Sequence, residues 1–295
     1  LNGADQTLDF RAQQEEESDG DDSEELRFRY IMPLFSRPYE LQWRLVRKIE
    51  NIEIDDFENI ETTDQFAMAV SRDWHIDALK IPIEVGSAIS FQDRGLDEPY
   101  PENLEAREAG RYNSLTLALV FDDVHNERYR RYGSFYSLAI EQGFSWLGSD
   151  YDSTIFEFQA IGFRRLDRYD NFNYRFVLEV ANDSPFDYPY YGIGGASNIR
   201  GLESVDDRGD ARVFTNLEYV FTYKRHPQLG HTLFLDIGNV YEDLDSIDLG
   251  DLHYTIGTGF RWKIESFVRT DLFLDYGYDV EEKDGKLYGG TSLAF

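Results

Sequence analysis

The stretch ARVFTNLEYVFT, residues 211–222, decides the fold, because its apolar and polar side chains alternate. One set contains Val213, Thr215, Leu217, Tyr219 and Phe221, and the set between them contains Arg212, Asn216 and Glu218. A period of two is the spacing at which successive side chains point to opposite faces of a β-strand. The stretch therefore predicts a strand with one apolar and one polar face.

The same alternation recurs along most of the chain. After Ser114 it predicts nine strands, near residues 115–121, 136–140, 156–160, 174–180, 213–221, 233–237, 252–262, 268–276 and 293–295. The N-terminal third is less regular, and we expect strands near residues 26–30 and 39–45 and a third between Gln65 and Ser90. The expected fold is all-β, with about 12 antiparallel strands.

Composition and the placement of aromatic residues favour a membrane barrel over a soluble sheet. Among 295 residues, 22 are Phe, 20 are Tyr and 23 are Gly, which favours many short strands joined by turns. Mean hydropathy is -0.53, and no stretch approaches the roughly 18 apolar residues of a spanning helix. A transmembrane β-barrel keeps the average low, because only every second side chain faces lipid. A soluble β-sandwich is the alternative, but aromatic residues at strand ends on the apolar face are typical of a membrane barrel.

The chain offers little reactive chemistry. It has no Cys and a formal net charge of -28, which excludes thiolate metal sites and argues against a nucleic-acid partner. The five histidines lie far apart without ligand spacing, at His75, His125, His226, His231 and His253. The run 192–195 is rich in glycine, but no strand-turn-helix pattern accompanies it, so it does not indicate a nucleotide site. We expect no catalytic residue, no metal and no cofactor.

Charge also marks the ends of the chain and of its strands. Residues 1–24 are rich in carboxylates and poor in apolar residues, so we expect a disordered acidic N-terminal arm, followed by a barrel over residues 25–295. An even strand number puts both termini on the periplasmic side. The expected outer loops are then acidic, at 93–108, 206–210, 243–251 and 279–284, and the short periplasmic turns are basic, with Arg128, Arg130, Arg131, Arg164, Arg165, Arg168, Lys224, Arg225 and Lys263.

The last eight residues read YGGTSLAF, residues 288–295. They resemble the terminal signal by which bacterial outer-membrane barrels are recognised for insertion, and the matching positions are Tyr288, Gly290, Leu293 and Phe295. A terminal edge strand presents unpaired backbone groups that another sheet can capture. The resemblance implies a location in the bacterial outer membrane and the insertion machinery as a partner during biogenesis.

A second resemblance lies in residues 193–202, IGGASNIRGL. The pattern of Gly194, Gly195, Arg200, Gly201 and Leu202 is similar to the Gly-Gly…Arg-Gly-aromatic lid loop of the superfamily that includes BamA, TamA and the two-partner secretion transporters, also called the bacterial surface antigen family. Leu202 stands where the family usually has an aromatic residue. Downstream, the stretches 216–219, NLEY, and 234–238, FLDIG, resemble the two strands that receive the loop's Arg.

The resemblance covers residues 114–295 and implies an inward-folded lid between the strands near 172–181 and 211–222. A period of two places the expected lumen partners of the lid, Glu218, Phe234, Asp236 and Gly238, on one face. A guanidinium can pair with both carboxylates and stack on the ring, and we expect Gly238 to leave room for it. Members of the family usually carry N-terminal periplasmic POTRA domains, so the chain resembles a short form without them.

The resemblance implies a non-enzymatic barrel that transports or assembles membrane components, with lipid or polypeptide cargo. The alternatives are a passive cation-preferring pore, favoured by the acidic loops, and an outer-membrane lipase. The expected partners are outer-membrane lipids and the insertion machinery. A separate periplasmic partner and a homodimer remain open.

Overall fold

The computed structural model describes residues 7–16, 22–34, 39–54, 57–76, 81–97, 108–127, 131–187, 189–202, 208–264 and 270–291. The strands are β1 (Thr7–Glu16), β2 (Asp22–Leu34), β3 (Tyr39–Ile54), β4 (Phe57–Ile76), β5 (Ile81–Leu96), β6 (Gly110–Asp122), β7 (His125–Asn126), β8 (Arg131–Gly143), β9 (Thr154–Arg165), β10 (Asp170–Asn182), β11 (Tyr191–Gly192), β12 (Arg208–Gly209), β13 (Ala211–Tyr223), β14 (His226–Tyr241), β15 (His253–Ile264), β16 (Thr270–Asp279) and β17 (Gly285–Gly290). Two 3₁₀ turns lie in connections between strands, η1 (Ser145–Leu147) after β8 and η2 (Pro185–Asp187) after β10. The all-β prediction is confirmed.

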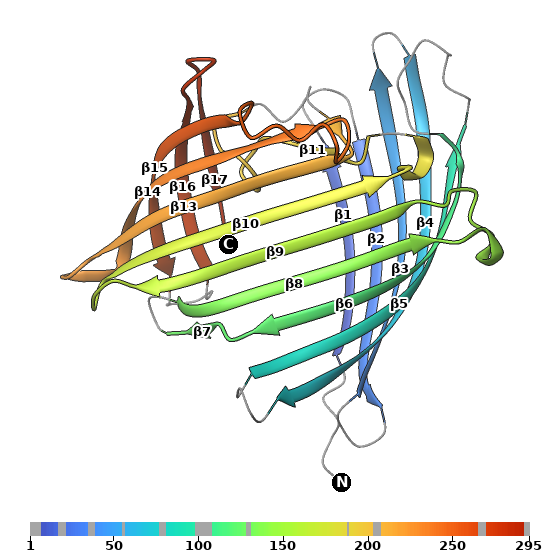
Figure 1. Cartoon of the computed structure of the whole chain (residues 1–295), viewed down its shortest axis with the longest axis horizontal. Helices are drawn as coiled ribbons and strands as arrows, with labels where there is room; N and C mark the ends of the chain where they lie inside the picture. Colours follow the sequence, from blue (N-terminus) through green and yellow to red (C-terminus); the bar gives the residue numbers. More distant parts are fainter. Residues whose placement is uncertain are drawn as a thin grey trace. The chain divides into compact units, whose positions relative to one another are not determined.

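One antiparallel sheet contains nearly all of these strands. Its order is β1-β2-β3-β4-β5-β6-β8-β9-β10-β13-β14-β15-β16-β17, with β7 paired to β8, so the described residues form a 15-stranded sheet (Figure 1). The short pair β11-β12 is separate and lies within the connection from β10 to β13. Consecutive strands are neighbours except where this long connection intervenes.

The expected number of strands was too low in the N-terminal third. Five strands precede Gly110 in the described chain, not three, and β1 lies inside the segment 1–24, where we expected an arm without structure. The expected strand between Gln65 and Ser90 is the end of β4 and the start of β5. The boundaries of β4 are weakly marked, because residues 55–56 and 77–80 contain neither Gly nor Pro, the strongest turn markers. Residues 1–6 and 17–21 of the expected arm lie outside the described residues.

After Ser114 the period-two prediction is confirmed for eight strands, and β17 is a further strand that the pattern did not predict. β17 ends at Gly290, while the expected last strand, 293–295, lies outside the described residues. The described chain divides into two compact units. Unit 1 contains Leu1–Leu119, Ala139–Phe156 and Asn182–Tyr188, and unit 2 contains Val120–Leu138, Glu157–Ala181 and Pro189–Phe295.

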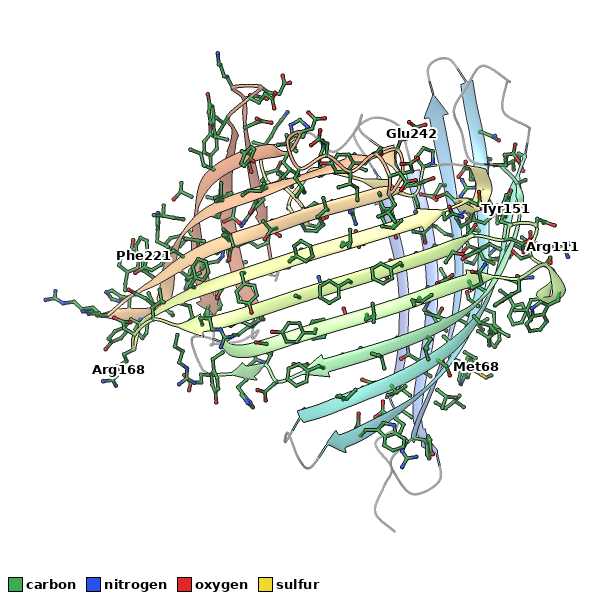
Figure 2. All side chains as sticks on the ribbon, viewed as in Figure 1. Met68, Arg111, Tyr151, Arg168, Phe221 and Glu242 are labelled. Carbon is green, nitrogen blue, oxygen red and sulfur yellow. The ribbon has the colours of Figure 1, made fainter. Side chains whose placement is uncertain are left out.

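The strands of unit 2 have two unlike faces. Cross-strand register aligns two neighbouring rows on one face, in which all residues but Phe234 are polar or small: Arg175, Asn216, Asp236, Thr255 and Asp279, and Asn173, Glu218, Phe234, Gly257 and Gly277. The opposite face carries exposed apolar side chains, among them Phe176, Tyr219, Leu233, Ile256, Phe260, Trp262, Leu274 and Tyr276. Figure 2 shows rings standing along the strands, with Phe221 near one strand end. The sheet therefore buries charge on one side and exposes apolar surface on the other.

Unit 1 shows the same division. On β4, Ile60, Phe66, Met68 and Trp74 are exposed, whereas Glu61 is buried and paired with Arg94 of β5. No helix of the described residues is long and apolar enough to cross a membrane.

The two-faced sheet predicts a position-dependent cost for an added charge. Ile256 on β15 is 51% exposed on the apolar face, and Ile256→Arg should lower the free energy of unfolding by about 2–4 kcal/mol if this face lies against lipid. Urea unfolding in lipid vesicles measures it. Leu249→Arg is the matched control, since Leu249 is 69% exposed in the loop between β14 and β15 and should tolerate the charge. Equal losses in both variants would contradict a lipid-facing sheet.

Candidate functional site: a folded-in loop held by a buried arginine

The long connection between β10 and β13 contains the loop that the sequence singled out. Gly194 and Gly195 have φ of 106° and 86°, and Gly201 has φ of 112°. These left-handed values are strained for residues with a side chain, so the three glycines are needed to turn the chain. The Gly195 N–H donates to the Leu202 carbonyl at 3.3 Å, which closes the loop on itself. Residues 189–202 are called the lid below.

Arg200 at the end of the lid is almost completely buried, with 2% of its surface exposed. Its Nε and Nη2 donate to the two oxygens of Asp236, both at 2.8 Å, and its Nη1 donates to Glu218 at 2.6 Å and to Asp275 at 3.0 Å. The guanidinium carbon lies 3.6 Å from the centre of the Phe234 ring. Carboxylates thus accept hydrogen bonds along the edge of the guanidinium, and an aromatic ring covers one of its faces.

A second cation belongs to the same cluster. Arg261 of β15 pairs with Asp275 through both terminal nitrogens and reaches Glu218 at 3.5 Å. Three carboxylates and two guanidinium groups therefore meet, which leaves one excess negative charge. Asp275 is the bridge between the two arginines.

Electrostatics favour the charged state of Arg200 despite its burial. Burial alone would lower the pKa of Arg200, but the hydrogen bond and charge of Asp236, with the charges of Glu218 and Asp275, outweigh it and raise the pKa above its ordinary value. A buried charge without partners costs several kcal/mol, so the cluster is stable only when all its members are present.

Glycines on the strands form the floor on which the lid rests. A Cβ on Gly277 of β16 would lie 2.5 Å from the backbone carbon and oxygen of Arg200, and one on Gly257 of β15 would overlap the ring of Phe234. The lid therefore touches the sheet backbone directly. Gly238, which we expected to leave room for Arg200, instead makes room for the backbone and Cβ of Phe214, so that part of the prediction was wrong.

Polar side chains of the sheet also bind the backbone of the lid. Arg212 donates to the Gly192 carbonyl at 2.5 Å, Arg175 to the Ser197 carbonyl at 2.7 Å, and Asn216 to the Asn198 carbonyl at 2.6 Å. Carbonyls that a folded-in loop removes from water thus keep hydrogen-bond partners.

The last described strand reaches the tip of the lid. The Tyr288 hydroxyl accepts from the Gly201 N–H and donates to the Leu202 carbonyl, both at 3.2 Å. Tyr288 was singled out only as part of the expected insertion signal, to which Gly290 at the end of β17 also belongs. Leu293 and Phe295 of that signal lie outside the described residues.

The structure brings together Arg200, Glu218, Asp236 and Phe234 as the sequence pattern predicts. Sequence reasoning missed Asp275, Arg261, Gly257, Gly277 and the bridging role of Tyr288. The alternation itself carried the missing signal for four of them, because Gly257, Arg261, Asp275 and Gly277 occupy the polar face of β15 and β16. Their contacts depend on register, which the pattern of one strand does not fix.

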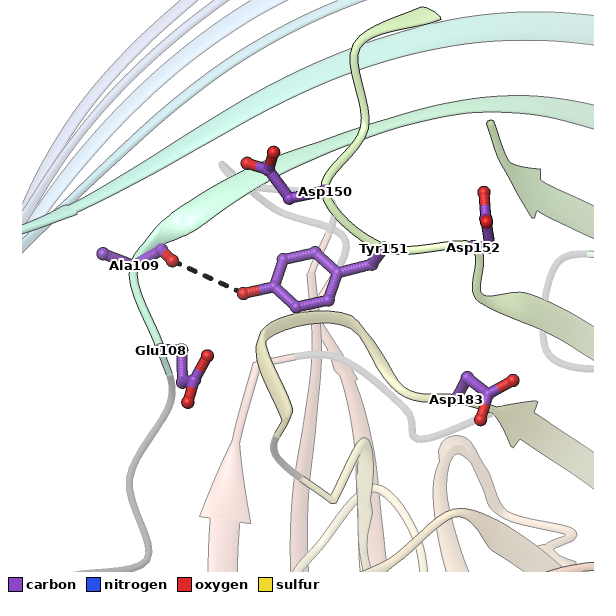
Figure 3. Close-up of a pocket in the computed structure, with 6 residues that line it drawn as sticks. All are labelled: Glu108, Ala109, Asp150, Tyr151, Asp152 and Asp183. Atoms are coloured by element: carbon purple, nitrogen blue, oxygen red, sulfur yellow. Dashed lines mark hydrogen bonds between the residues drawn. The ribbon is translucent and has the colours of Figure 1, made fainter. Parts of the chain in front are cut away.

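Unit 1 contains an acidic pocket of about 520 Å³ in its loops (Figure 3). Its lining is Glu108, Ala109, Asp150, Tyr151, Asp152 and Asp183. Asp150 accepts the Arg111 N–H at 2.8 Å and Asp152 accepts the Ser145 N–H at 3.2 Å, so these carboxylates cap loop backbone. In the part of the chain that the structure describes, no group of three His, Cys, Asp or Glu side chains is placed to hold a metal ion.

A long antiparallel sheet with one apolar and one charged face is typical of outer-membrane barrels, and here a loop is fastened to the charged face. The sequence matches the Omp85 superfamily domain over residues 1–290, and the chain belongs to this superfamily. It is an outer-membrane barrel, and part of its sequence is similar to an outer-membrane assembly factor. The expected family and location are confirmed.

Comparisons with known proteins give the extent of the similarity. The outer membrane protein assembly factor BamA of Nitratidesulfovibrio vulgaris is 33% identical over 129 residues, covering 39% of this chain and 16% of that protein. BamA from Haemophilus ducreyi lacking POTRA domains 1-3 has a similar fold, with a TM-score of 0.66 and 14% identity over 92% of this chain and 65% of that one. CdiB from Acinetobacter baumannii gives a TM-score of 0.70 and 13% identity over 96% of this chain and 52% of that one. The chain thus spans less than two thirds of each relative.

Removing the charge of Arg200 should loosen the lid and leave the barrel folded. Arg200→Ala leaves three carboxylates with only Arg261 among them, and loss of one member of a buried cluster typically costs about 3–5 kcal/mol, less where water enters. We expect faster proteolysis near residues 196–210 and a higher single-channel conductance. Arg200→Lys should restore little, because an ammonium cannot fork to the carboxylates and stack on the ring. Wild-type proteolysis and conductance in both variants would contradict the anchoring role.

A methyl group added to a glycine of the strand beneath the lid should lift the lid without changing any charge. Gly277→Ala places a Cβ 2.5 Å from the Arg200 backbone, and because the β16 backbone is held by its ladder bonds, the lid must move away. We expect it to raise conductance as Arg200→Ala does. Gly289→Ala on the neighbouring strand is the matched control, because its Cβ would find its nearest atom at 3.5 Å. Equal behaviour of the two alanine variants would argue against close lid-to-sheet contact.

Proposed function

We propose that this protein is a non-enzymatic barrel that transports or assembles membrane components, with the lid as a plug of its lumen. The observation that carries the proposal is the burial of Arg200 among Glu218, Asp236 and Asp275. A loop fastened by a multiply bonded guanidinium narrows the lumen, and a narrowed lumen suits gated passage better than free diffusion. The proposed cargo is lipid or polypeptide. The proposed partners of the barrel are the insertion machinery and outer-membrane lipids.

Chemistry at the cluster gives little support to a hydrolase. Each arginine of the cluster is paired with carboxylates, and no Ser, Cys or Thr nucleophile next to a histidine base is among the residues that hold the lid. The cluster has the composition of a structural anchor, so we propose that neither Arg200 nor Asp236 reacts with cargo.

Planar-bilayer recording separates the plugged transporter from the passive pore. A closed or flickering wild type, together with a more conductive Arg200→Ala, supports the plug. A stable ohmic current from the wild type would refute it and favour a cation-preferring pore. The acidic pocket of unit 1 is the observation that favours that second function, since its four carboxylates raise the local cation concentration.

The cargo class has its own test. Deletion of the gene, followed by profiling of outer-membrane proteins and lipids, should change one class of component, and the wild-type gene should restore it. The Arg200→Ala gene should restore it incompletely. A membrane whose protein and lipid content is unchanged by deletion would refute a transport or assembly role.

A further inference from the structure

The apolar face of unit 1 contains a cation among apolar neighbours. Arg72 follows the period of β4 that places Phe66, Met68, Val70 and Trp74 on one face. Met68 (Figure 2) and Trp74 are 41% and 48% exposed, which identifies this face as the outward one. Across the sheet, Arg72 is the register partner of Tyr39 on β3 and Val85 on β5.

Two aromatic residues hold the guanidinium of Arg72. Its carbon lies 4.0 Å from the centre of the Trp74 ring and 4.9 Å from that of Tyr39, and its Nη1 donates to the Tyr39 hydroxyl at 2.7 Å. Its Nε is buried and has no hydrogen-bond partner among the described residues. The aromatic contacts fix the plane of the cation but leave hydrogen-bonding capacity unused.

In the described part of the chain, no carboxylate pairs with Arg72. The nearest acid on the same face of β4 is Asp64, eight residues earlier, which is about 27 Å along an extended strand. Asp64 is already paired with Arg47 at 3.4 Å. Asp73 and Glu84 belong to the opposite face by the period of two. Within the described residues, the positive charge of Arg72 is therefore available to an external anion.

The position of Arg72 indicates where that anion lies. The residues between Asp64 and Arg72 on this face are Phe66, Met68 and Val70, which form an apolar band. With the usual strand tilt of about 35–45°, the 27 Å between the two charged positions corresponds to a height of about 20 Å, close to the lipid-facing band of membrane barrels. Arg72, Tyr39 and Trp74 thus sit at the depth of the headgroups, where Trp and Tyr gather.

We propose that Arg72, framed by Tyr39 and Trp74, binds the phosphate of a glycerophospholipid headgroup. The guanidinium offers a planar fork to the phosphate oxygens, and the Tyr39 hydroxyl and Trp74 ring hold the fork in place. The apolar residues beside it accept the acyl chains. Charge complementarity and the headgroup depth favour a lipid over a protein partner.

Titration of the purified protein with phosphatidylglycerol, followed by native mass spectrometry, tests the site. Arg72→Gln should weaken the tightest bound lipid about tenfold, because it removes a charge-assisted pair of hydrogen bonds. Arg47→Gln is the matched control, since Arg47 lies on the same face but already has Asp64 as partner, and it should bind as the wild type does. Diacylglycerol, which has no phosphate, should bind both variants and the wild type alike.

Several outcomes would overturn the proposal. One is that Arg72→Gln binds phosphatidylglycerol as tightly as the wild type does. Another is that Arg47→Gln loses as much affinity for this lipid as Arg72→Gln. The third is that inorganic phosphate displaces the lipid, which would indicate a site for free anions. Arg72→Lys gives a second test should the Gln variant not fold. It keeps the charge but not the fork, so it should bind severalfold more weakly than the wild type, and full affinity would refute the fork geometry.

Discussion

The pairing of Arg200 with Asp236 is the interaction on which the arrangement of the lid depends. A guanidinium removed from water is stable only where its donors and its face are matched, and Asp236, Glu218, Asp275 and Phe234 supply the match from three strands. The cluster therefore requires β14 to lie in register with both β13 and β15, and β15 with β16. A slip of one residue would turn every partner to the other face.

Close approach of two backbones is the second constraint. The lid can bring Arg200 to Asp236 only because its own chain lies on the sheet at Gly277, with the ring of Phe234 lowered onto Gly257. The glycines thus set the height of the lid, and the charges set its position along the strands. Both the close backbone contact and the charge pairing are needed, because a raised lid would move the guanidinium of Arg200 out of hydrogen-bond range of Asp236.

Sequence reasoning succeeded where one face of a strand is apolar and the other polar. From Ser114 onward the alternation predicted the eight long strands β6, β8, β9, β10, β13, β14, β15 and β16. The resemblance to the lid loop indicated Arg200 and its partners on β13 and β14. It missed β1, the boundary between β4 and β5, and Asp275, whose contact with Arg200 joins residues 75 apart. Tyr288 was assigned to insertion alone, because no local pattern shows that a hydroxyl on β17 bonds to the peptide groups around Gly201.

The lid is consequently bound to the end of the sheet as well as to its middle. Asp275 of β16 joins Arg200 to Arg261, and the hydroxyl of Tyr288 on β17 bonds to the Gly201 N–H and the Leu202 carbonyl at the tip of the lid. Leu202, where relatives of this loop usually carry an aromatic residue, provides only its backbone to that contact. An aromatic side chain is thus present at the tip, but it comes from another strand. Displacing β17 must break the two hydrogen bonds between Tyr288 and the lid. Displacing the lid leaves the β16–β17 ladder intact. The position of the lid therefore depends on β17, whereas the pairing of β17 does not depend on the lid.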